Sequence, residues 1–314
     1  GISFSVQDKI KIARILDELQ VDYIEAGNPG SNPKDMEFFE LLQQNPLKHA
    51  KVTAFGATRK KNIAVEEDAN IKSLLSANTD CVTIFGKSWD IHVTDILRAE
   101  LSENLAMIRD TVRYLKAKGK EVVYDAEHFF DGYRANPEYA LSTLQAAYES
   151  GADCLVLCDT NGGSFPDFVQ NATRLVKERF PVAVGIHAHD DAGMAAANSV
   201  LAVTAGATHV QGTLAGFGER CGNANLSTVL ANLQLKLGYD CVPNEALERL
   251  TSTVHEVADI SNISVGKNMP YVGANAFAHK GGMHVDGVMK NSLTFEHVSP
   301  SAVGNNRRVM MSEV

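Results

Sequence analysis

The sequence is short of basic residues and has no long apolar run. Its 29 lysines and arginines are outnumbered by 38 aspartates and glutamates, which gives a formal net charge of −9. Binding along a nucleic acid backbone requires a positively charged surface, so no nucleic acid partner is expected. A membrane span needs about 18 consecutive apolar residues, and the sequence contains no such run. We therefore expect no membrane association and a cytoplasmic location.

Cysteine is also scarce. Five cysteines in 314 residues are an odd number and are widely scattered, which excludes a disulfide framework and favours reduced thiols. The content of 45% hydrophobic, 21% charged and 7% aromatic residues excludes a disordered or collagen-like chain. The length suits either two domains of about 150 residues or one α/β barrel with a smaller unit.

Short runs rich in valine and isoleucine alternate with helical patterns along most of the chain. The predicted strands are 21–26, 52–56, 81–86, 121–127, 154–160, 183–190 and 209–215. The first and last strands start 188 residues apart, which corresponds to six units of about 31 residues. This regular spacing predicts a repeat of β-α units with parallel strands and right-handed crossovers.

Two architectures contain such a repeat: an open doubly wound sheet and a closed eight-stranded barrel. No glycine fingerprint follows an early strand, which disfavours the doubly wound sheet. We therefore predict a TIM (β/α)8 barrel over residues 1–240. The chain opens with a helix capped by Ser5, with Asp8 in the position of a capping box, so the first barrel strand is expected upstream of Gly1.

Beyond residue 240 the pattern changes to a helix over 244–259, followed by an irregular stretch rich in glycine. We predict a small accessory subdomain over residues 241–314. The chain ends within a strand-like run, 308–311, so we expect that it is cut before any regulatory domain.

The sharpest candidate site lies at the end of the strand predicted at 183–190. Side chains alternate along a strand, so His187 and His189 point to one face, where two imidazoles can converge on a metal ion. The carboxyl ends of barrel strands are where such enzymes carry their sites. The alternative is a pair of half-buried histidines that donate to backbone carbonyls.

A glycine-rich loop, 216–223, follows the last predicted strand. Its third glycine comes one residue too late for a nucleotide-binding fingerprint. A turn that carries Asn223 over the barrel mouth is the better interpretation, with the amide oxygen available to a hard cation. A loop that glycine merely rigidifies is the alternative.

Polar residues also end two neighbouring strands. Asp125 and Glu127 share a face, so a paired-carboxylate acid/base site is conceivable, and their mutual repulsion would raise one pKa. Alternatively, Glu127 pairs with an arginine such as Arg134. Thr160 ends the next strand on the face that also carries Cys154 and Cys158, which we expect to pack in the core.

The accessory region contains a glycine-flanked segment with His284 and Asp286. A histidine oriented by a carboxylate can take up a proton near neutral pH. A hydrogen bond at the surface is the alternative explanation for this pair.

Three segments together, GIHAHDD at 185–191, GFGERCGN at 216–223 and AFAHKGGMHVDG at 276–287, carry a resemblance that spans the chain. They resemble the metal-dependent Claisen-type acyltransferases of the isopropylmalate, homocitrate and citramalate synthase family. The stretches FGKSWDIHV, YDAEHFFDGY and LCDTNGG are most similar to the citramalate synthase branch, which joins acetyl-CoA to pyruvate in the route to isoleucine. The family opens with an Asp-x-Thr-Leu-Arg-Asp-Gly strand that this sequence does not contain.

The resemblance implies roles for the candidate residues. His187, His189 and Asn223 would hold a divalent ion, which the ligand types allow to be magnesium, manganese or zinc. Asp125, Glu127 and Thr160 would line the site of the 2-oxo acid, and His284 would help to deprotonate the acetyl group of acetyl-CoA. The family's accessory subdomain reaches over the barrel of a partner, which implies a homodimer.

The sequence also allows other functions. The same chemistry on another 2-oxo acid would make the chain a 2-isopropylmalate or homocitrate synthase. The related hydroxymethylglutaryl-CoA lyases cleave a carbon–carbon bond of a CoA thioester, and a non-catalytic barrel for binding or assembly is a third possibility.

Overall fold

A computed structural model describes residues 4–310 and contains one parallel sheet of seven strands in the order β1 to β7. The strands are β1 Tyr23–Glu25, β2 Lys51–Ala57, β3 Cys81–Lys87, β4 Glu121–Glu127, β5 Cys154–Asp159, β6 Ala183–Ala188 and β7 His209–Gln211. The helices between and around them are α1 Val6–Leu19, α2 Pro33–Gln44, α3 Ala69–Ser76, α4 Leu101–Ala117, α5 Phe129–Ala135, α6 Pro137–Glu149, α7 Pro166–Arg179, α8 Ala195–Thr204 and α9 Leu226–Ala231. All seven predicted strands are therefore present, in the predicted order.

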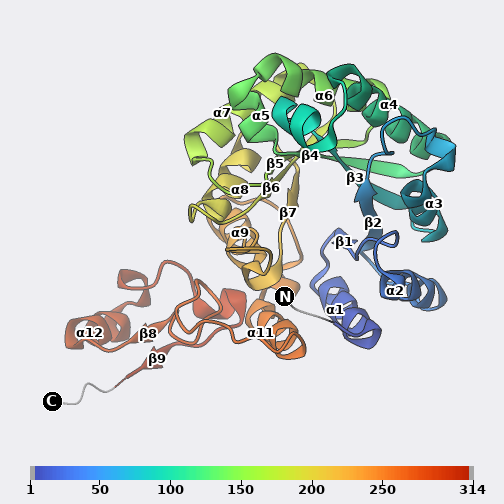
Figure 1. The fold of residues 1–314 in the computed structure, drawn as a ribbon. Helices are drawn as coiled ribbons and strands as arrows, with labels where there is room; N and C mark the ends of the chain where they lie inside the picture. The colour runs from blue at the N-terminus through green and yellow to red at the C-terminus, as the bar shows by residue number, and fades with distance from the viewer. Residues whose placement is uncertain (1–3, 311–314) are drawn as a thin grey trace.

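The sheet curls toward a barrel, and its helices lie along the outer, convex face (Figure 1). A doubly wound sheet carries helices on both faces, so the barrel prediction is confirmed and the open-sheet alternative is wrong. Among residues 4–310, strands β1 and β7 form the two edges of the sheet and are not paired with each other.

The two edge strands are shorter than predicted. Strand β1 covers Tyr23–Glu25 rather than 21–26, and β7 covers His209–Gln211 rather than 209–215. An edge strand has a hydrogen-bonded neighbour on one side only, so fewer ladder bonds hold its ends in place. The central strand β4 has the predicted bounds.

The main core lies between the sheet and the outer helices. Outward-facing strand residues such as Val184 and Ile186 are fully buried there, together with Ile108 and Leu144 from α4 and α6. The inner face holds a smaller cluster that includes Cys154 and Cys158, so the prediction that these cysteines pack in the core is confirmed. The two faces differ because strand side chains alternate.

The first helix begins as predicted. The Ser5 hydroxyl accepts from the backbone N–H of Asp8, and the Asp8 carboxylate accepts from the backbone N–H of Ser5, which completes a capping box. Inside the helix, the buried carboxylate of Asp17 accepts from the backbone N–H groups of residues 48, 49 and 50, just before β2. These bonds tie the start of the chain to the sheet.

The segment after residue 240 is more irregular. Its elements are α10 Asn244–Leu247, α11 Leu250–Ile260, β8 Ala278–His279, α12 Gly282–Lys290 and β9 Arg308–Val309. The helix predicted over 244–259 is therefore two helices. The strand-like run at 308–311 is confirmed over Arg308–Val309, where β9 pairs with β8, and Met311 lies outside the described residues.

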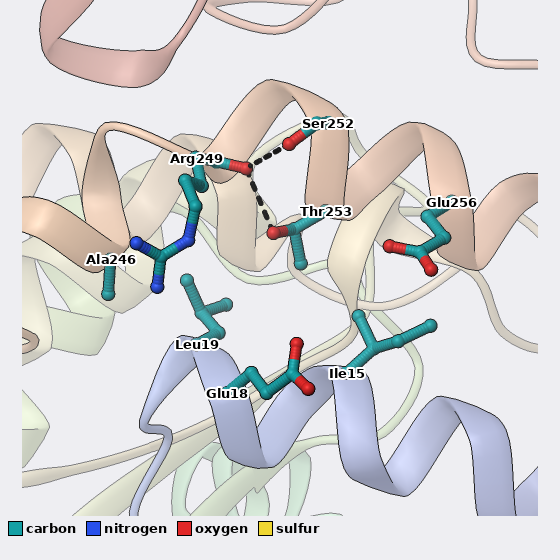
Figure 2. A pocket seen from close by; sticks show the side chains of 8 residues that line it. All are labelled: Ile15, Glu18, Leu19, Ala246, Arg249, Ser252, Thr253 and Glu256. Atoms are coloured by element: carbon teal, nitrogen blue, oxygen red, sulfur yellow. Dashed lines mark hydrogen bonds between the residues drawn. The ribbon is translucent and has the colours of Figure 1, made fainter.

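Helix α11 packs against α1, and a small cavity of about 90 Å³ lies between them. Figure 2 shows the side chains that line it. Leu19 of α1 and Leu250 of α11 belong to one apolar cluster. The carbonyl of Arg249 accepts from the hydroxyls of Ser252 and Thr253 at 3.0 and 2.9 Å, within the first turn of α11. Helices α10 and α11 thus pack on the barrel, whereas α12, β8 and β9 form an arm that extends away from it (Figure 1). The boundary at residue 240 stays a prediction.

No helix among residues 4–310 combines the length and apolar character that crossing a lipid bilayer requires.

Candidate active site at the carboxyl ends of the strands

The candidate residues of the barrel meet at one end of the sheet. Parallel strands in register bring their carboxyl ends to one edge, where β4, β5, β6 and β7 lie side by side. Alternation places Glu127, His187 and Gln211 on the inner face of their strands. The structure therefore brings six of the seven predicted site residues into one region, and the seventh, His284, lies on the arm.

His187 and His189 converge as the spacing predicts. Both side chains are half-buried, and their ring centroids lie 5.2 Å apart with the ring planes 41° apart. His189 lies just beyond the last residue of β6, and its backbone N–H donates to the carbonyl of Asp159 at 3.2 Å. This bond to the neighbouring strand end holds the second histidine beside the first.

The two imidazoles differ in their hydrogen bonds. Nδ1 of His187 lies 2.8 Å from Oε1 of Gln211, whereas Nδ1 of His189 is buried and has no partner. Burial lowers the pKa of His189, and the neighbouring His187 and Arg220 lower it further. His189 is therefore neutral at physiological pH, which is the form in which an imidazole binds a metal ion.

Asn223 faces the histidines from the glycine-rich loop. Its backbone pairs with His189 in an isolated antiparallel bridge, and its Nδ2 donates to the carbonyl of Phe217 at 2.8 Å. The amide oxygen Oδ1 is buried without a partner. Gly218, with a φ of 154°, permits this arrangement, because a Cβ there would lie 2.1 Å from Nδ2 of Asn223.

Two buried polar atoms without partners, Nδ1 of His189 and Oδ1 of Asn223, are an expensive arrangement unless a ligand binds them. Imidazole nitrogen and amide oxygen together suit a divalent cation, so the residues present fit the implied metal ion. Across residues 4–310, no group of three or more His, Cys, Asp or Glu side chains is arranged to hold an ion. The contribution of the described chain is therefore two imidazoles and one amide oxygen.

Asp125 and Glu127 point to the same inner face of β4. Asp125 is only 4% exposed and accepts from Nε2 of Gln211 at 3.0 Å. Burial raises the pKa of Asp125; the Gln211 hydrogen bond lowers it, and the nearby Glu127 carboxylate raises it again, with a net upward shift. The expected repulsion between the two carboxyl groups is present.

Glu127 pairs with Lys87 at 3.0 Å, and the expected pairing with Arg134 is wrong. The register of β3 and β4 sets Lys87 directly beside Glu127, whereas the guanidinium of Arg134 lies 4.4 Å from the ring centroid of Phe168. The second carboxylate oxygen, Oε2 of Glu127, is buried without a partner. Glu127 therefore has an acceptor available to a bound molecule.

Thr160 lies one residue beyond β5. Its hydroxyl oxygen accepts from the backbone N–H of His128 at 2.8 Å, which leaves the hydroxyl hydrogen free to donate. His128 adopts the left-handed conformation, with a φ of 56°, at the start of α5. The backbone N–H of a residue in this strained conformation therefore holds the Thr160 hydroxyl in its orientation.

Three functional neighbours were not identified from the sequence. Lys87 and Gln211 contact candidate residues directly, but only strand register brings them there. Alternation within the predicted strand 209–215 gives the inward orientation of Gln211, whereas Lys87 lies one residue beyond the predicted strand 81–86. The sequence gives the contact partners of neither residue. Glu25, on β1, faces the same interior. The surrounding protein atoms displace water from the Glu25 carboxyl and raise its pKa, and the Asp125 carboxyl raises that pKa further. The Glu25 side chain is nevertheless exposed at the open edge of the sheet.

Arg220 connects three loops at this end of the sheet. Its guanidinium pairs with Asp191 at 2.8 Å and donates to the carbonyl of Thr160 at 2.6 Å. The loops that follow β5, β6 and β7 are therefore fixed relative to one another. Their stable arrangement keeps Thr160, His189 and Asn223 in place.

The structure does not bring His284 to the barrel residues of its own chain. Its exposed ring stacks on Phe295 with a centroid distance of 4.2 Å, in the arm that extends from the barrel (Figure 1). The expected pair between His284 and Asp286 is wrong. Both lie in α12, where residues two apart face different directions, and Asp286 pairs instead with Lys290 at 2.8 Å.

Comparison with known families identifies the class of protein. The family model described as HMGL-like matches residues 1–260. A second model, described as homocitrate synthase post-HMGL domain-like, matches residues 271–313. The chain belongs to the HMGL-like family of TIM-barrel proteins.

Individual relatives indicate which members of the family the chain is similar to. The chain is 55% identical over 315 residues to the (R)-citramalate synthase of Aquifex aeolicus, covering 100% of this chain and 60% of that protein. It is 54% identical over 322 residues to that of Synechocystis, covering 100% and 59%. The 2-isopropylmalate synthase of Sulfolobus acidocaldarius is 36% identical over 314 residues, covering 100% and 78%. The chain thus spans about 60% of the length of these citramalate synthases.

Solved structures support the fold. The HMG-CoA lyase of Bacillus subtilis superimposes with a TM-score of 0.69 at 19% identity, covering 84% of this chain and 89% of that chain. The carboxyl transferase domain of Rhizobium etli pyruvate carboxylase superimposes with a TM-score of 0.58 at 14% identity, covering 82% and 44%. At these identities the likeness concerns the fold alone.

Proposed function

We propose that this chain is the catalytic portion of an (R)-citramalate synthase, which condenses acetyl-CoA with pyruvate and hydrolyses the thioester to citramalate and CoA. The observation that carries the proposal is the identity of 47–55% to five citramalate synthases along the whole chain. The 2-isopropylmalate synthases reach 34–36%. Citramalate formation would place the reaction in the synthesis of isoleucine, and a cytoplasmic location stays a prediction.

His187, His189 and Asn223 are the residues that would hold a divalent ion, because the two imidazoles lie side by side, Asn223 is bridged to His189, and Nδ1 of His189 and Oδ1 of Asn223 lack partners. When bound, the ion would draw electron density from the keto carbonyl of the 2-oxo acid. Magnesium, manganese and zinc all suit this ligand set.

The remaining barrel residues suit a small oxo acid. The hydroxyl of Thr160 has a hydrogen free to donate to a carboxylate of the substrate, and Oε2 of Glu127 is free to accept from a bound group. Lys87 fixes the orientation of the Glu127 carboxylate through their 3.0 Å contact. Phe55 and Phe85, stacked with their centroids 5.1 Å apart on β2 and β3, would restrict the size of the substrate side chain.

A base must act on the acetyl group, because the methyl of a thioester is a weak acid. We assign this step to His284, whose imidazole is exposed and carries no ion pair. Since His284 lies on the arm, the proposal includes a homodimer in which each arm reaches the barrel of the partner. Exposed apolar side chains on the same arm, Met283 at 80% and Met289 at 75%, suit burial against a second copy.

The decisive test is an assay of product formation with acetyl-CoA and either pyruvate or 2-oxoisovalerate, in the presence of Mn²⁺. We expect citramalate as the main product and a higher kcat/KM for pyruvate. A higher value for 2-oxoisovalerate would assign the chain to the isopropylmalate branch, and cleavage of a hydroxyacyl-CoA thioester without synthesis would assign it to the lyases.

The variant His187→Ala separates the enzyme from a non-catalytic barrel. It should lose both Mn²⁺ and turnover while it retains the far-ultraviolet circular dichroism and the melting temperature of the wild type. If His187→Ala keeps full turnover, the ligand assignment is wrong.

A further inference from the structure

Gln211 connects the candidate metal site to the buried carboxyl of Asp125. It lies on β7 directly opposite His187 on β6, and both side chains point to the inner face of the sheet. Its Oε1 lies 2.8 Å from Nδ1 of His187, and its Nε2 donates to Oδ1 of Asp125 at 3.0 Å. One amide group thus bridges three strands, β4, β6 and β7.

The orientation of the Gln211 amide follows from the atoms that it contacts. Asp125 presents an accepting oxygen to the amide, so the NH₂ group of Gln211 points toward it. Nε2 of His209 lies 3.3 Å from the same amide nitrogen. A flip of the amide would place its oxygen against the accepting oxygen of Asp125, so the hydrogen bond to Asp125 sets the orientation of the amide.

This orientation determines the proton on His187. The amide oxygen can only accept, so Nδ1 of His187 must carry the hydrogen, and the lone pair of the neutral ring is then on Nε2. His189 differs, because its Nδ1 has no partner and is not constrained in this way.

We propose that Gln211 is a positioning residue that holds His187 as the Nδ1–H tautomer and leaves Nε2 to bind the divalent ion. This inference rests on the proposed function for its metal ion, but the tautomer itself is a property of the chain without metal. Loss of a residue that orients a metal-binding histidine typically costs about 10- to 100-fold in metal affinity.

The test compares three variants of the full chain with the wild type. Gln211→Leu removes both hydrogen bonds at similar volume, and Gln211→Glu retains an acceptor for Nδ1–H. Gln170→Leu makes the same chemical change as the first variant on α7, where the half-buried Gln170 donates to the hydroxyl of Thr204 at 3.1 Å. Melting temperatures establish that each variant is folded.

Two measurements are made: the tautomer of His187 from ¹H–¹⁵N spectra of the metal-free chain, and Mn²⁺ affinity from calorimetry. We expect Nδ1–H in the wild type, in Gln211→Glu and in Gln170→Leu. Gln211→Leu should gain the Nε2–H form and bind Mn²⁺ about 10- to 100-fold more weakly.

An unchanged tautomer in Gln211→Leu would overturn the inference and leave the proposed function intact. If the wild type instead binds no Mn²⁺, the proposed function loses its metal site, and the tautomer comparison alone decides the role of Gln211. If Gln211→Leu does not fold, Gln211→Glu decides. An Nε2–H tautomer of His187 in Gln211→Glu would show that an accepting oxygen at position 211 does not set the tautomer.

Discussion

His189 and Asn223 pair in an isolated antiparallel bridge, and each carries a buried polar side-chain atom without a hydrogen-bond partner. Their segments are 34 residues apart in the sequence and belong to different loops. Backbone hydrogen bonds between the neighbouring residues hold the two candidate ligands together. Their relative position is therefore set by the fold of the chain itself.

Asn223→Ala tests whether this pre-formed pair binds a cation. The variant should bind Mn²⁺ at least about tenfold more weakly, because one oxygen ligand is lost while the backbone bridge remains. Calorimetry with Mn²⁺ measures the change, and Asn171→Ala on the exposed face of α7 is the matched control. Equal affinity in the two variants would remove Asn223 from the metal site.

Lys87→Met tests the ion pair with Glu127. Without the cation 3.0 Å away, the carboxylate should lose its fixed orientation. Small displacements of a reacting group cost about 10- to 100-fold in rate, so we expect kcat/KM to fall within that range.

Lys87→Arg should recover part of the loss, because it keeps the positive charge. Lys116→Met is the control, since Lys116 pairs with Asp153, ahead of β5 and remote from the strand ends that form the site. A Lys87→Met enzyme with the kinetics of the wild type would contradict the positioning of Glu127.

The proposed dimer is tested by mixing two inactive variants. His187→Ala lacks a functional barrel site, and His284→Ala lacks the proposed base. If each arm serves the partner's barrel, mixed dimers contain one intact site, and random reassembly should restore about one quarter of wild-type activity.

Mixing each variant with more of itself is the control for this experiment. No recovery after verified subunit exchange would show that His284 does not act across a dimer. Sedimentation of the wild-type chain as a monomer would exclude the dimer itself.

Asp17→Ala tests the attachment of α1 to the sheet. Burial acts to raise the pKa of Asp17, but three backbone N–H bonds and the nearby His49 outweigh it, so the pKa in the folded chain is lowered. The ionised carboxylate therefore stabilises the folded state above the pKa of an unfolded aspartate, about 3.9, and this contribution is lost as the pH falls through the folded pKa.

We expect Asp17→Ala to lower the free energy of unfolding by on the order of 3 kcal/mol at pH 7, since hydrogen bonds to a charged group are lost. The difference from the wild type should shrink below about pH 4. Urea denaturation at several pH values measures it. A difference that is constant down to pH 2 would show that packing, not ionisation, accounts for the effect.

Several features were determined by the sequence alone. Seven apolar runs at a regular spacing sufficed for a parallel β-α repeat, because each run is too short and too apolar to be a surface helix. Alternation along 183–190 placed His187 and His189 on one face, and Ser5 with Asp8 marked the start of α1, since both signals depend only on local geometry.

Only the tertiary structure decided which side chains meet. Register between strands pairs Glu127 with Lys87 and not with Arg134, and it sets Gln211 beside His187. Helical geometry separates His284 from Asp286, and the path of the arm separates both from the barrel of their own chain. Strand register and arm direction depend on contacts between segments far apart in the sequence, so local spacing contains no information about them.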